Sequence, residues 1–430
     1  MKIAVVGSGV AGLSAAWLLQ RRHDVTVLEA DTRLGGHAHT VSVEVDGVDV
    51  AVDTGFIVFN HRTYPLFCRM LDELGVAERL SSMTFSASIM DSGVEYAGTD
   101  LDRLFVQRSN LLRPSFWRMV LGIRRFYRES RSLLDSRAGE VALGEYLTEH
   151  GYPQSFIDDH LLPMAAAVWS TDRARMMAFP ASFLVRFFEH HGFLELENRP
   201  DWYTVEGGSI RYVDAIAAVL GDAVRCATPV RGVRPRAGAV EVDLDSGTET
   251  FDHVVLATHV DTSLRLLKAP TAAQESILGK FSCRTNAAVL HTDARMMPRN
   301  KRAWASWNTH VGTDPGAPPT LTYWMNHLQS LPVATPILLT LNREDEIDPR
   351  DVLGRWDYDH PIFTPDSVAA AARLPEIQGR DGIWFAGAAW GYGFHEDGVR
   401  SGVQVACALG VPFGEDLPGR PMDLIFEADR

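Results

Sequence analysis

The first thirty residues constrain the fold more than any other part of this chain. Residues 3–29, IAVVGSGVAGLSAAWLLQRRHDVTVLE, pass from an apolar run through a glycine-rich turn and an apolar helical stretch to a second apolar run that ends in an acid. The change of hydrophobic period predicts a strand at 2–6, a helix at 10–21 and a strand at 25–29. The chain therefore begins with a βαβ unit, which is typical of an α/β domain.

The turn in this unit has the pattern GxGxxG. Gly7 permits the tight bend, Gly9 lets the backbone approach a pyrophosphate, and Gly12 lets the helix pack closely on the strand. Val10 and Ala11 follow at the helix N-terminus, where backbone amides face the phosphates. The turn therefore predicts a dinucleotide site.

Glu29 ends the second strand 20 residues after Gly9 and is followed by Ala30. A carboxylate at this place accepts hydrogen bonds from both hydroxyls of a ribose and repels a 2′-phosphate, which argues against NADP. These residues alone leave both NAD and FAD open.

A second glycine-rich turn lies near the other end of the chain, in residues 383–402, IWFAGAAWGYGFHEDGVRSG. A strand at 383–386 delivers Gly387, and a helix is expected to start near Asp397, with Gly398 and Val399 in its first turn. The positive end of that helix would stabilise the negative charge of a reduced flavin near N1 and C2. A nicotinamide dehydrogenase needs only the first turn, so the pair predicts FAD, with its pyrophosphate at one turn and its ring at the other. The alternative is a glycine-rich loop that leads into an amphipathic helix.

Residues 33–40, RLGGHAHT, add a glycine pair just beyond the acidic strand end. With this run the chain resembles the flavin amine oxidase and phytoene desaturase superfamily, in which an RxGGxxxT segment follows the ribose-binding glutamate. The resemblance implies further cofactor-binding positions along the chain, namely Arg33, Gly35, Gly36, His37, Thr54, Gly55, Val230 and Ala257. No cysteine lies in the C-terminal turn, so we expect FAD to be bound non-covalently.

The segment GYGFHEDG, together with GGHAHT, AAAVWST at 165–171 and WASWN at 304–308, resembles a narrower group of FAD oxidoreductases. These accompany cyclopropane-fatty-acyl-synthase-like methyltransferases and include desaturases of methyl-branched acyl chains in furan fatty acid synthesis. The resemblance implies a desaturase or dehydrogenase of a lipid or fatty acyl chain that acts by hydride transfer to flavin N5. It also implies a lipid-like substrate and a methyltransferase as partner.

Flavin amine oxidases commonly carry a lysine near the flavin on a strand of the substrate domain. The comparable segment here, 286–290, reads NAAVL and has none. This departure argues against an amine oxidase, which stays an alternative together with a double-bond isomerase.

Three polar residues of the second turn, Tyr392, His395 and Glu396, are the predicted catalytic groups. A histidine with a pKa near neutral could take up a proton while a hydride goes to N5. In the alternative, His395 and Glu396 bond the flavin or cap the following helix.

The pattern along the chain predicts two domains that are interleaved in sequence. Residues 41–46 and 48–53 alternate around Gly47 and predict a hairpin. From about 61 to 199 the pattern is mainly helical, and strand signals return from 223 onward and again between 285 and 342. The predicted fold class is α/β, with a Rossmann-like, glutathione-reductase-like FAD-binding domain and an α+β substrate domain. We assign 1–60, 200–265 and 375–430 to the first, and 61–199 and 266–374 to the second.

Composition limits the partners. The formal net charge of −14 argues against nucleic acid, and no uninterrupted apolar run is long enough for a membrane span. The four cysteines form no CxxC pair and the histidines are scattered, so we expect no metal site. The N-terminus enters a strand at once without a signal sequence, which predicts a cytoplasmic protein.

One segment departs from the acidic background. Residues 101–137 contain nine arginines and three acids, a local net charge of +6, with leucines and aromatic residues interleaved. Two interpretations remain open. In one, this is a solvated helix face whose apolar side packs inward. In the other, it docks on anionic lipid headgroups at the inner face of the membrane.

Overall fold

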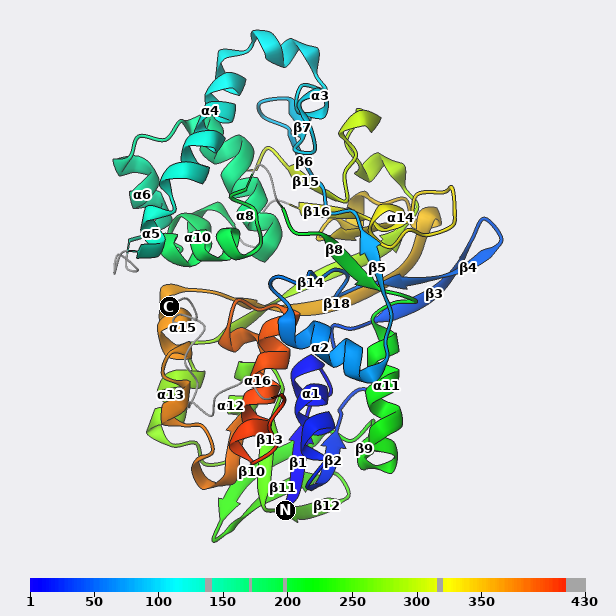
Figure 1. Cartoon of the computed structure of the whole chain (residues 1–430), viewed down its shortest axis with the longest axis vertical. Helices are drawn as coiled ribbons and strands as arrows, with labels where there is room; N and C mark the ends of the chain where they lie inside the picture. Colours follow the sequence, from blue (N-terminus) through cyan, green and yellow to red (C-terminus); the bar gives the residue numbers. More distant parts are fainter. Residues whose placement is uncertain (136–140, 170–171, 196–198, 315–319, 415–430) are drawn as a thin grey trace.

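The computed structural model describes residues 1–135, 141–169, 172–195, 199–314 and 320–414. The molecule is elongated and has two halves (Figure 1). The half that contains the N-terminus is built on a five-stranded sheet, and the other half on a seven-stranded sheet with a group of helices.

The five-stranded sheet has the order β19-β13-β1-β2-β9, and all its strands are parallel. The predicted βαβ unit forms its centre, because β1 pairs with β2 on one side and with β13 on the other. The strand order changes direction at β1, which is the place where open α/β sheets generally bind ligands, at the carboxyl ends of their strands. The predicted α/β fold class is confirmed. The elements are β1 (Lys2–Val6), α1 (Val10–Leu19), β2 (Asp24–Leu28), β9 (Val224–Arg225), β13 (His253–Leu256) and β19 (Ile383–Phe385).

The first and the last described helices lie side by side in this half. Helix α16 (His395–Ala408) runs beside α1, and α11 (Ile210–Leu220) packs against α1 as well (Figure 1). A Cβ on Gly402 would lie 2.5 Å from the carbonyl oxygen of Ala11, and one on Gly398 would lie 2.6 Å from Cγ1 of Val10. Glycine at these places therefore allows the two helices to approach closely.

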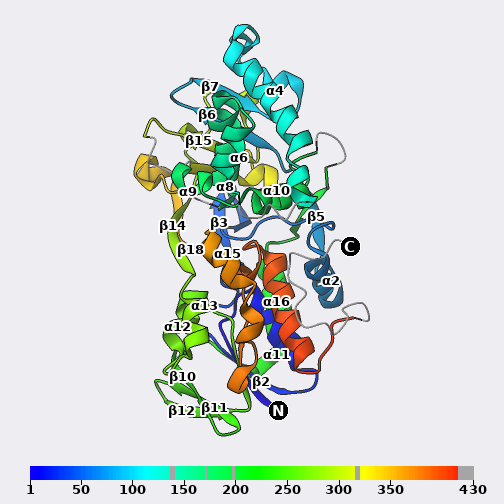
Figure 2. The same ribbon diagram turned by 90° about the vertical axis from the view of Figure 1, so that its left-hand side faces the viewer.

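The seven-stranded sheet has the order β18-β14-β17-β16-β15-β6-β7. The long antiparallel pair β14 and β18 crosses the middle of the molecule between the two halves (Figures 1 and 2). The strands are β6 (Phe85–Ile89), β7 (Val94–Ala97), β14 (Ser282–His291), β15 (Trp307–Val311), β16 (Thr320–Trp324), β17 (Leu338–Leu341) and β18 (Val352–Ile362).

The region predicted to be mainly helical contains three strands as well. Strands β6 and β7 form one edge of the large sheet, and β5 (Glu78–Ser81) pairs with β8 (Trp202–Val205). Strand β6 reads FSASI and lies between β7 and β15; its parallel partner β15 is more than 200 residues away, so no local pattern reveals the pairing on that side. The helices over this half include α4 (Pro114–Glu129), α6 (Leu143–Glu149), α8 (Leu162–Trp169), α9 (Arg173–Met177) and α10 (Ala181–His190).

Two antiparallel elements complete the fold. The predicted hairpin is present as β3 (Thr40–Val45) and β4 (Val48–Asp53), turned at Asp46 and Gly47, which both have positive φ angles as a two-residue hairpin turn requires. A three-stranded sheet consists of β10 (Val230–Arg236), β11 (Ala239–Leu244) and β12 (Gly247–Phe251).

The predicted domain boundaries stay a prediction. The five-stranded sheet draws its strands from 1–60, 200–265 and 375–430, and the seven-stranded sheet draws its strands from 61–199 and 266–374. No helix among the described residues combines the length and apolarity that a bilayer crossing requires.

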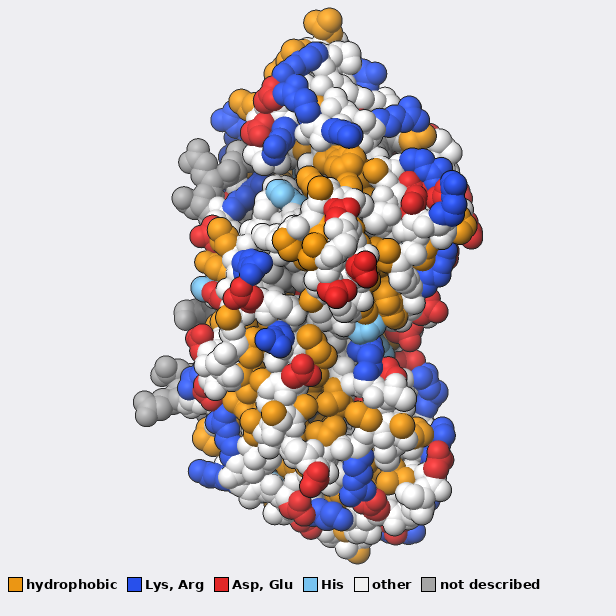
Figure 3. All heavy atoms as spheres, turned by 90° about the vertical axis from the view of Figure 1, so that its right-hand side faces the viewer, with side chains coloured by type: hydrophobic (Ala, Val, Ile, Leu, Met, Phe, Trp, Pro, Cys, Tyr) orange, Lys and Arg blue, Asp and Glu red, His pale blue; other side chains and the backbone are white. Residues whose placement is uncertain are grey.

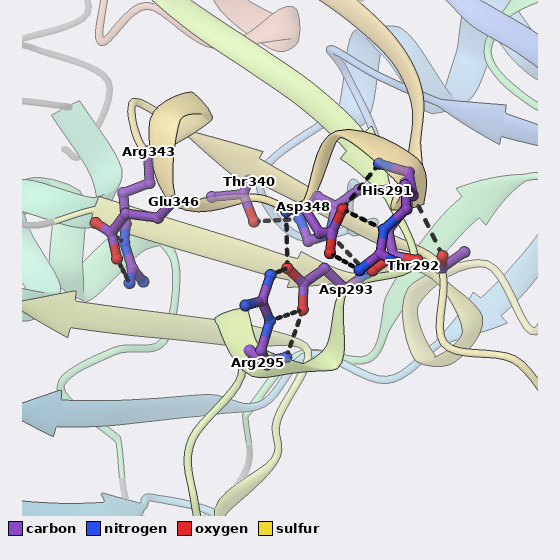
Figure 4. Close-up of polar contacts among 10 residues, drawn as sticks. His291, Thr292, Asp293, Arg295, Thr340, Arg343, Glu346 and Asp348 are labelled. Carbon is purple, nitrogen blue, oxygen red and sulfur yellow. Dashed lines mark hydrogen bonds and ion pairs between the residues drawn. The ribbon is translucent and has the colours of Figure 1, made fainter.

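A cluster of polar side chains closes the far end of β14 (Figure 4). The buried carboxylate of Asp293 accepts two hydrogen bonds from the Arg295 guanidinium and one from the backbone amide of Asp348. His291 accepts from the amide of Asp293 and bonds the Thr340 hydroxyl. Arg295 holds the pKa of Asp293 well below its usual range. Because its polar atoms are paired with one another, the cluster stabilises the fold and is not a candidate site.

Candidate functional site

In the first glycine turn, Gly7 and Gly12 have no room for a side chain, whereas Gly9 faces open space. A Cβ on Gly12 would lie 2.0 Å from the carbonyl oxygen of Gly7, and one on Gly7, whose φ is 99°, would lie 2.8 Å from the carbonyl oxygen of Ala257. A Cβ on Gly9 would meet nothing within 4 Å. Gly9 is the N-cap of α1 and gives its first-turn amides no side-chain acceptor. Open space in front of uncapped amides fits a diphosphate.

Glu29 lies at the end of β2, as predicted. Its carboxylate accepts hydrogen bonds from the amide of Ser8 at 2.7 Å, from the Ser8 hydroxyl at 2.6 Å and from the amide of Asp31 at 2.8 Å. A carboxylate has about four acceptor positions, so capacity for a ribose hydroxyl remains. Ala30 is exposed beside it, and Val230 begins β10 and belongs to the same hydrophobic cluster as Leu28 of β2.

The second glycine pair folds onto the first turn. The amide of Gly35 donates to the carbonyl oxygen of Ser8 at 3.0 Å, and a Cβ on Gly36 would lie 3.1 Å from Cα of Gly9. Arg33 is half-exposed and lies 3.6 Å from Asp31. The loop thus lies against the first glycine turn, and its role in binding a diphosphate stays a prediction.

His37 holds an unpaired polar atom in this loop. Its ring centroid lies 5.4 Å from that of His360, 5.9 Å from that of His259 and 5.3 Å from that of Tyr358. Burial, followed by the neighbouring histidines, lowers the pKa of His37 well below its usual value, and the ring bonds the backbone of Asp359. Its Nε2 is buried and has no partner among the described residues. Such an atom fits a site that receives a polar group from a bound cofactor.

The turn after β4 is braced by a buried acid. Asp53 accepts hydrogen bonds from the hydroxyls of Thr40 and Ser209 and from the side-chain amide of Gln329, and burial raises its pKa to about 6. Thr54 follows, 2.6 Å from the hydroxyl of Tyr358. Gly55 comes next, where a Cβ would lie 2.1 Å from the carbonyl oxygen of His37.

In the second turn, the predicted cofactor residues surround the start of α16. The amide of Gly387 donates to the Ser401 hydroxyl at 2.8 Å. The Asp397 carboxylate accepts from the amides of Tyr392 and Phe394, and burial raises its pKa to about 6. The Asp397 side chain therefore braces its own loop.

The three predicted catalytic side chains point into different surroundings. The His395 ring stacks on Phe56 with centroids 3.5 Å apart, and its Nε2 lies 3.1 Å from the Tyr212 hydroxyl. Burial lowers the pKa of His395 to about 3, so the imidazole is neutral at physiological pH. The Tyr392 ring lies in the core of the helical region, 4.6 Å from the ring of Phe183.

Glu396 connects two helices. Its carboxylate accepts from the backbone amides of Leu66 and Phe67 at the start of α2 (Pro65–Leu74), and it lies 3.3 Å from Arg400. Burial raises its pKa to about 7. The N-cap of α2, Tyr64, makes no side-chain capping bond, so Glu396 caps this helix from a distant part of the chain. The catalytic roles of Tyr392, His395 and Glu396 stay predictions.

A cavity lies between the helices and the β14–β18 ladder. Its walls are mainly aromatic and apolar, its polar groups include two guanidiniums, and no Asp or Glu is among the described residues that line it. These are Trp169, Arg175, Phe179, Arg284, Asn286, His360, Pro361, Ile362 and Phe363. Arg175 lies 3.5 Å from Asp172, whereas the Arg284 guanidinium pairs with no described residue.

Asn286 occupies the strand segment where the resemblance to amine oxidases expects a lysine. It is fully buried, accepts from the Asn342 side-chain amide at 2.8 Å, and donates to Nδ1 of His360 at 2.7 Å and to the carbonyl oxygen of Arg284 at 3.3 Å. Because Nδ1 of the neutral His360 accepts this bond, its proton is placed on Nε2. Burial lowers the pKa of His360 to about 4, so this tautomer persists at neutral pH.

The sequence patterns did not identify Arg284, His360 or Tyr358 as members of the site. His360 and Tyr358 belong to β18, a strand that those patterns did not predict. The alternation of Tyr358, His360 and Ile362 on one face of that strand is the one local signal that could have drawn attention to it.

The comparisons with known proteins agree with this geometry. The family model for flavin containing amine oxidoreductase matches residues 10–353. A carotenoid phi-ring synthase from Streptomyces griseus is 28% identical over 287 residues, which are 62% of this chain and 54% of that protein. The chain thus spans about half the length, or less, of the curated relatives it matches.

Solved structures share the fold at low sequence identity. Cyclohexylamine oxidase from Brevibacterium oxydans IH-35A superposes with a TM-score of 0.71 at 14% identity, covering 95% of this chain and 98% of that one. A fatty acid isomerase from P. acnes, described as producing CLA, superposes with a TM-score of 0.65 at 15% identity and the same coverage.

Proposed function

The chain belongs to the flavin-containing amine oxidoreductase family, and from this premise we propose an FAD-dependent oxidoreductase that removes two hydrogens from an acyl chain carrying an anionic head group. Bound FAD would supply the hydride acceptor, and the second hydrogen would leave as a proton, for which His395 is the predicted acceptor. The open space at Gly9, the free capacity of Glu29 and the unpaired nitrogen of His37 support FAD as the cofactor. We expect non-covalent binding.

The positive charge of the cavity is the observation that supports a substrate with an anionic head group. Its cationic groups are Arg175 and Arg284, and its described lining residues include no carboxylate to pair with an ammonium group. A carboxylate or phosphate head would pair with the free guanidinium of Arg284, and the walls of Trp169, Phe179 and Phe363 suit an apolar chain. An uncharged or cationic amine would leave the guanidinium of Arg284 without a counter-ion, whereas Arg175 already lies beside Asp172.

His360 orients the substrate in this proposal. Its Nε2–H is a donor, because Asn286 fixes the opposite ring nitrogen as an acceptor. Asn286 is in turn held by Asn342, so the imidazole is part of a chain of oriented hydrogen bonds. His360 would therefore donate to an oxygen of the substrate and hold it beside the carboxyl end of β1.

The test is anaerobic reduction of the purified holoprotein. Fatty acids and acyl phospholipids with methyl branches should bleach the flavin absorbance, and mass spectrometry should find a product two mass units lighter, which is the loss of two hydrogens. Cyclohexylamine, putrescine and L-amino acids serve as the control panel. If an amine bleaches the flavin and no acyl compound does, the acyl assignment is wrong.

A double-bond isomerase is the second candidate, and the solved fatty acid isomerase that shares the fold favours it. The same experiment separates the two functions. An isomerase would return a product of unchanged mass, and the flavin would be oxidised again at the end of each turnover without an added acceptor.

A further inference from the structure

Residues 101–129 present two sets of apolar side chains. The inner set packs into the protein: Phe116, Met119, Phe126 and Tyr127 are buried. The outer set is exposed to solvent. Inward packing therefore explains only part of the apolar content of this segment.

The outer set is concentrated. Ten large hydrophobic side chains are exposed among the described residues, and five of them lie within a stretch of 21 residues that includes α3 (Leu101–Leu104) and the first half of α4. They are Leu101 (75% exposed), Leu111 (46%), Leu112 (88%), Trp117 (42%) and Leu121 (61%). A local concentration of this kind marks an interaction surface, whereas single exposed leucines do not.

Cations lie among these side chains. Trp117, Leu121, Arg124 and Arg128 recur at i, i+4, i+7 and i+11, so they share one face of α4, with Arg118 at its border. The guanidiniums of Arg118 and Arg124 pair with no described residue, which leaves them free for an external anion.

The charge of this end differs from that of the rest of the protein. Figure 3 shows Lys and Arg side chains gathered at the upper end of the molecule with few acids among them, and Figure 1 shows α3 and α4 at that end. The segment 101–137 carries +6, so the remainder of the chain carries −14 − 6 = −20. The protein would therefore approach a negatively charged partner with this positively charged end first.

We propose that this tip, formed by residues 101–128, docks on the surface of an anionic lipid bilayer. Leu111, Leu112, Trp117 and Leu121 enter the boundary between headgroups and acyl chains, and Arg118 and Arg124 pair with lipid phosphates. A helix that exposes leucine and tryptophan between free arginines fits this occupant, because the bilayer offers an anionic layer directly above an apolar one. The inference does not depend on the proposed chemistry.

The test is co-sedimentation of the full chain with vesicles. We expect binding to vesicles that contain phosphatidylglycerol in phosphatidylcholine, at least tenfold weaker binding to pure phosphatidylcholine, and a loss of binding at high salt because surface charges are then screened. The double variant Leu112→Ser/Leu121→Ser and the double variant Arg118→Ser/Arg124→Ser should each weaken binding at least tenfold. All four side chains are exposed, so thermal unfolding should match that of the unchanged protein.

The matched control is Val219→Ser, which changes an apolar side chain 49% exposed on α11 and should bind vesicles normally. Equal binding to neutral and anionic vesicles would overturn the proposal, as would unchanged binding of either double variant. The mass in solution gives a further check: a dimer that Leu112→Ser/Leu121→Ser converts to a monomer would assign this surface to a second copy of the chain instead. None of these measurements uses turnover, so a wrong substrate assignment and a wrong docking surface would be told apart.

Discussion

At the scale of single residues, Gly9 and Gly12 belong to one motif but are glycine for different reasons: Gly12 for packing and Gly9 for the predicted approach of a phosphate. A Cβ on Gly12 would overlap the carbonyl of Gly7, whereas a Cβ on Gly9 would enter open space. We expect Gly12→Ala to destabilise the fold by about 1–3 kcal/mol, the usual range for overpacking. Gly9→Ala should unfold at the same temperature as the unchanged apoprotein but lose flavin. Thermal unfolding of the apoproteins and retained flavin absorbance measure both effects, and equal flavin retention in Gly9→Ala would contradict the assigned phosphate position.

Arg284 gives a second prediction at this scale. Arg284→Gln removes a cation that pairs with no described residue, so the fold should keep its stability. Loss of one charge-assisted contact to a substrate carboxylate should raise KM for a free fatty acid roughly ten- to a hundredfold. Arg284→Lys should restore part of the affinity, and the methyl ester of the same acid should be indifferent to the change. An unchanged KM would remove Arg284 from the substrate site.

At the scale of elements, Glu396 joins α16 to α2. We expect Glu396→Ala to destabilise the fold by about 0.5–2 kcal/mol, because the amides of Leu66 and Phe67 lose their cap. Glu396→Gln keeps an acceptor oxygen and should retain most of the stability and the turnover. Chemical denaturation and steady-state rates distinguish the two variants. If Glu396→Gln is stable but inactive, the predicted catalytic role is correct after all.

At the scale of the whole molecule, buried histidines set the response to acid. Seven have a folded-state pKa lowered from 6.5 to about 3 or 4 by burial: His39, His160, His191, His291, His310, His360 and His395. Between about pH 4 and 6.5 the unfolded chain binds protons at these positions and the folded chain does not, so folding stability rises with pH.

Three buried acids oppose this trend. Burial raises the pKa of Asp53 and Asp397 to about 6 and that of Glu396 to about 7, so each binds more protons in the folded state and favours folding on acidification. The histidines outnumber the acids, so we expect the unfolding temperature to fall as pH is lowered from 6.5 to 4. A calorimetric series across this range checks the sign, and His191→Asn should make the dependence shallower. An unfolding temperature that rises on acidification would mean that the three acids outweigh the seven histidines, contrary to this prediction.

The prediction from sequence was accurate where the determinants are local. The βαβ unit, the hairpin turned at Gly47 and the helix after Gly387 each depend on a hydrophobic period and a turn residue within about thirty positions. Strand β18 was not predicted, because it pairs with β14, about 70 residues earlier in the sequence. Strand β6 was not predicted either; it pairs with the neighbouring β7 on one side, but its partner on the other side, β15, is more than 200 residues away. Strand β18 matters most for the proposed function, since it supplies His360 to the cavity.

The amino-acid sequence by itself determined the two strand–turn–helix units near its two ends, because steric limits at glycine and the periods of strand and helix act within a few residues. The tertiary structure decided which polar side chains meet. The Asn286–His360 bond spans 74 residues, and the bond from Phe67 to Glu396 spans 329. Such hydrogen bonds form because buried polar groups need partners once the chain has packed. The type of each residue does not specify which distant residue becomes its partner.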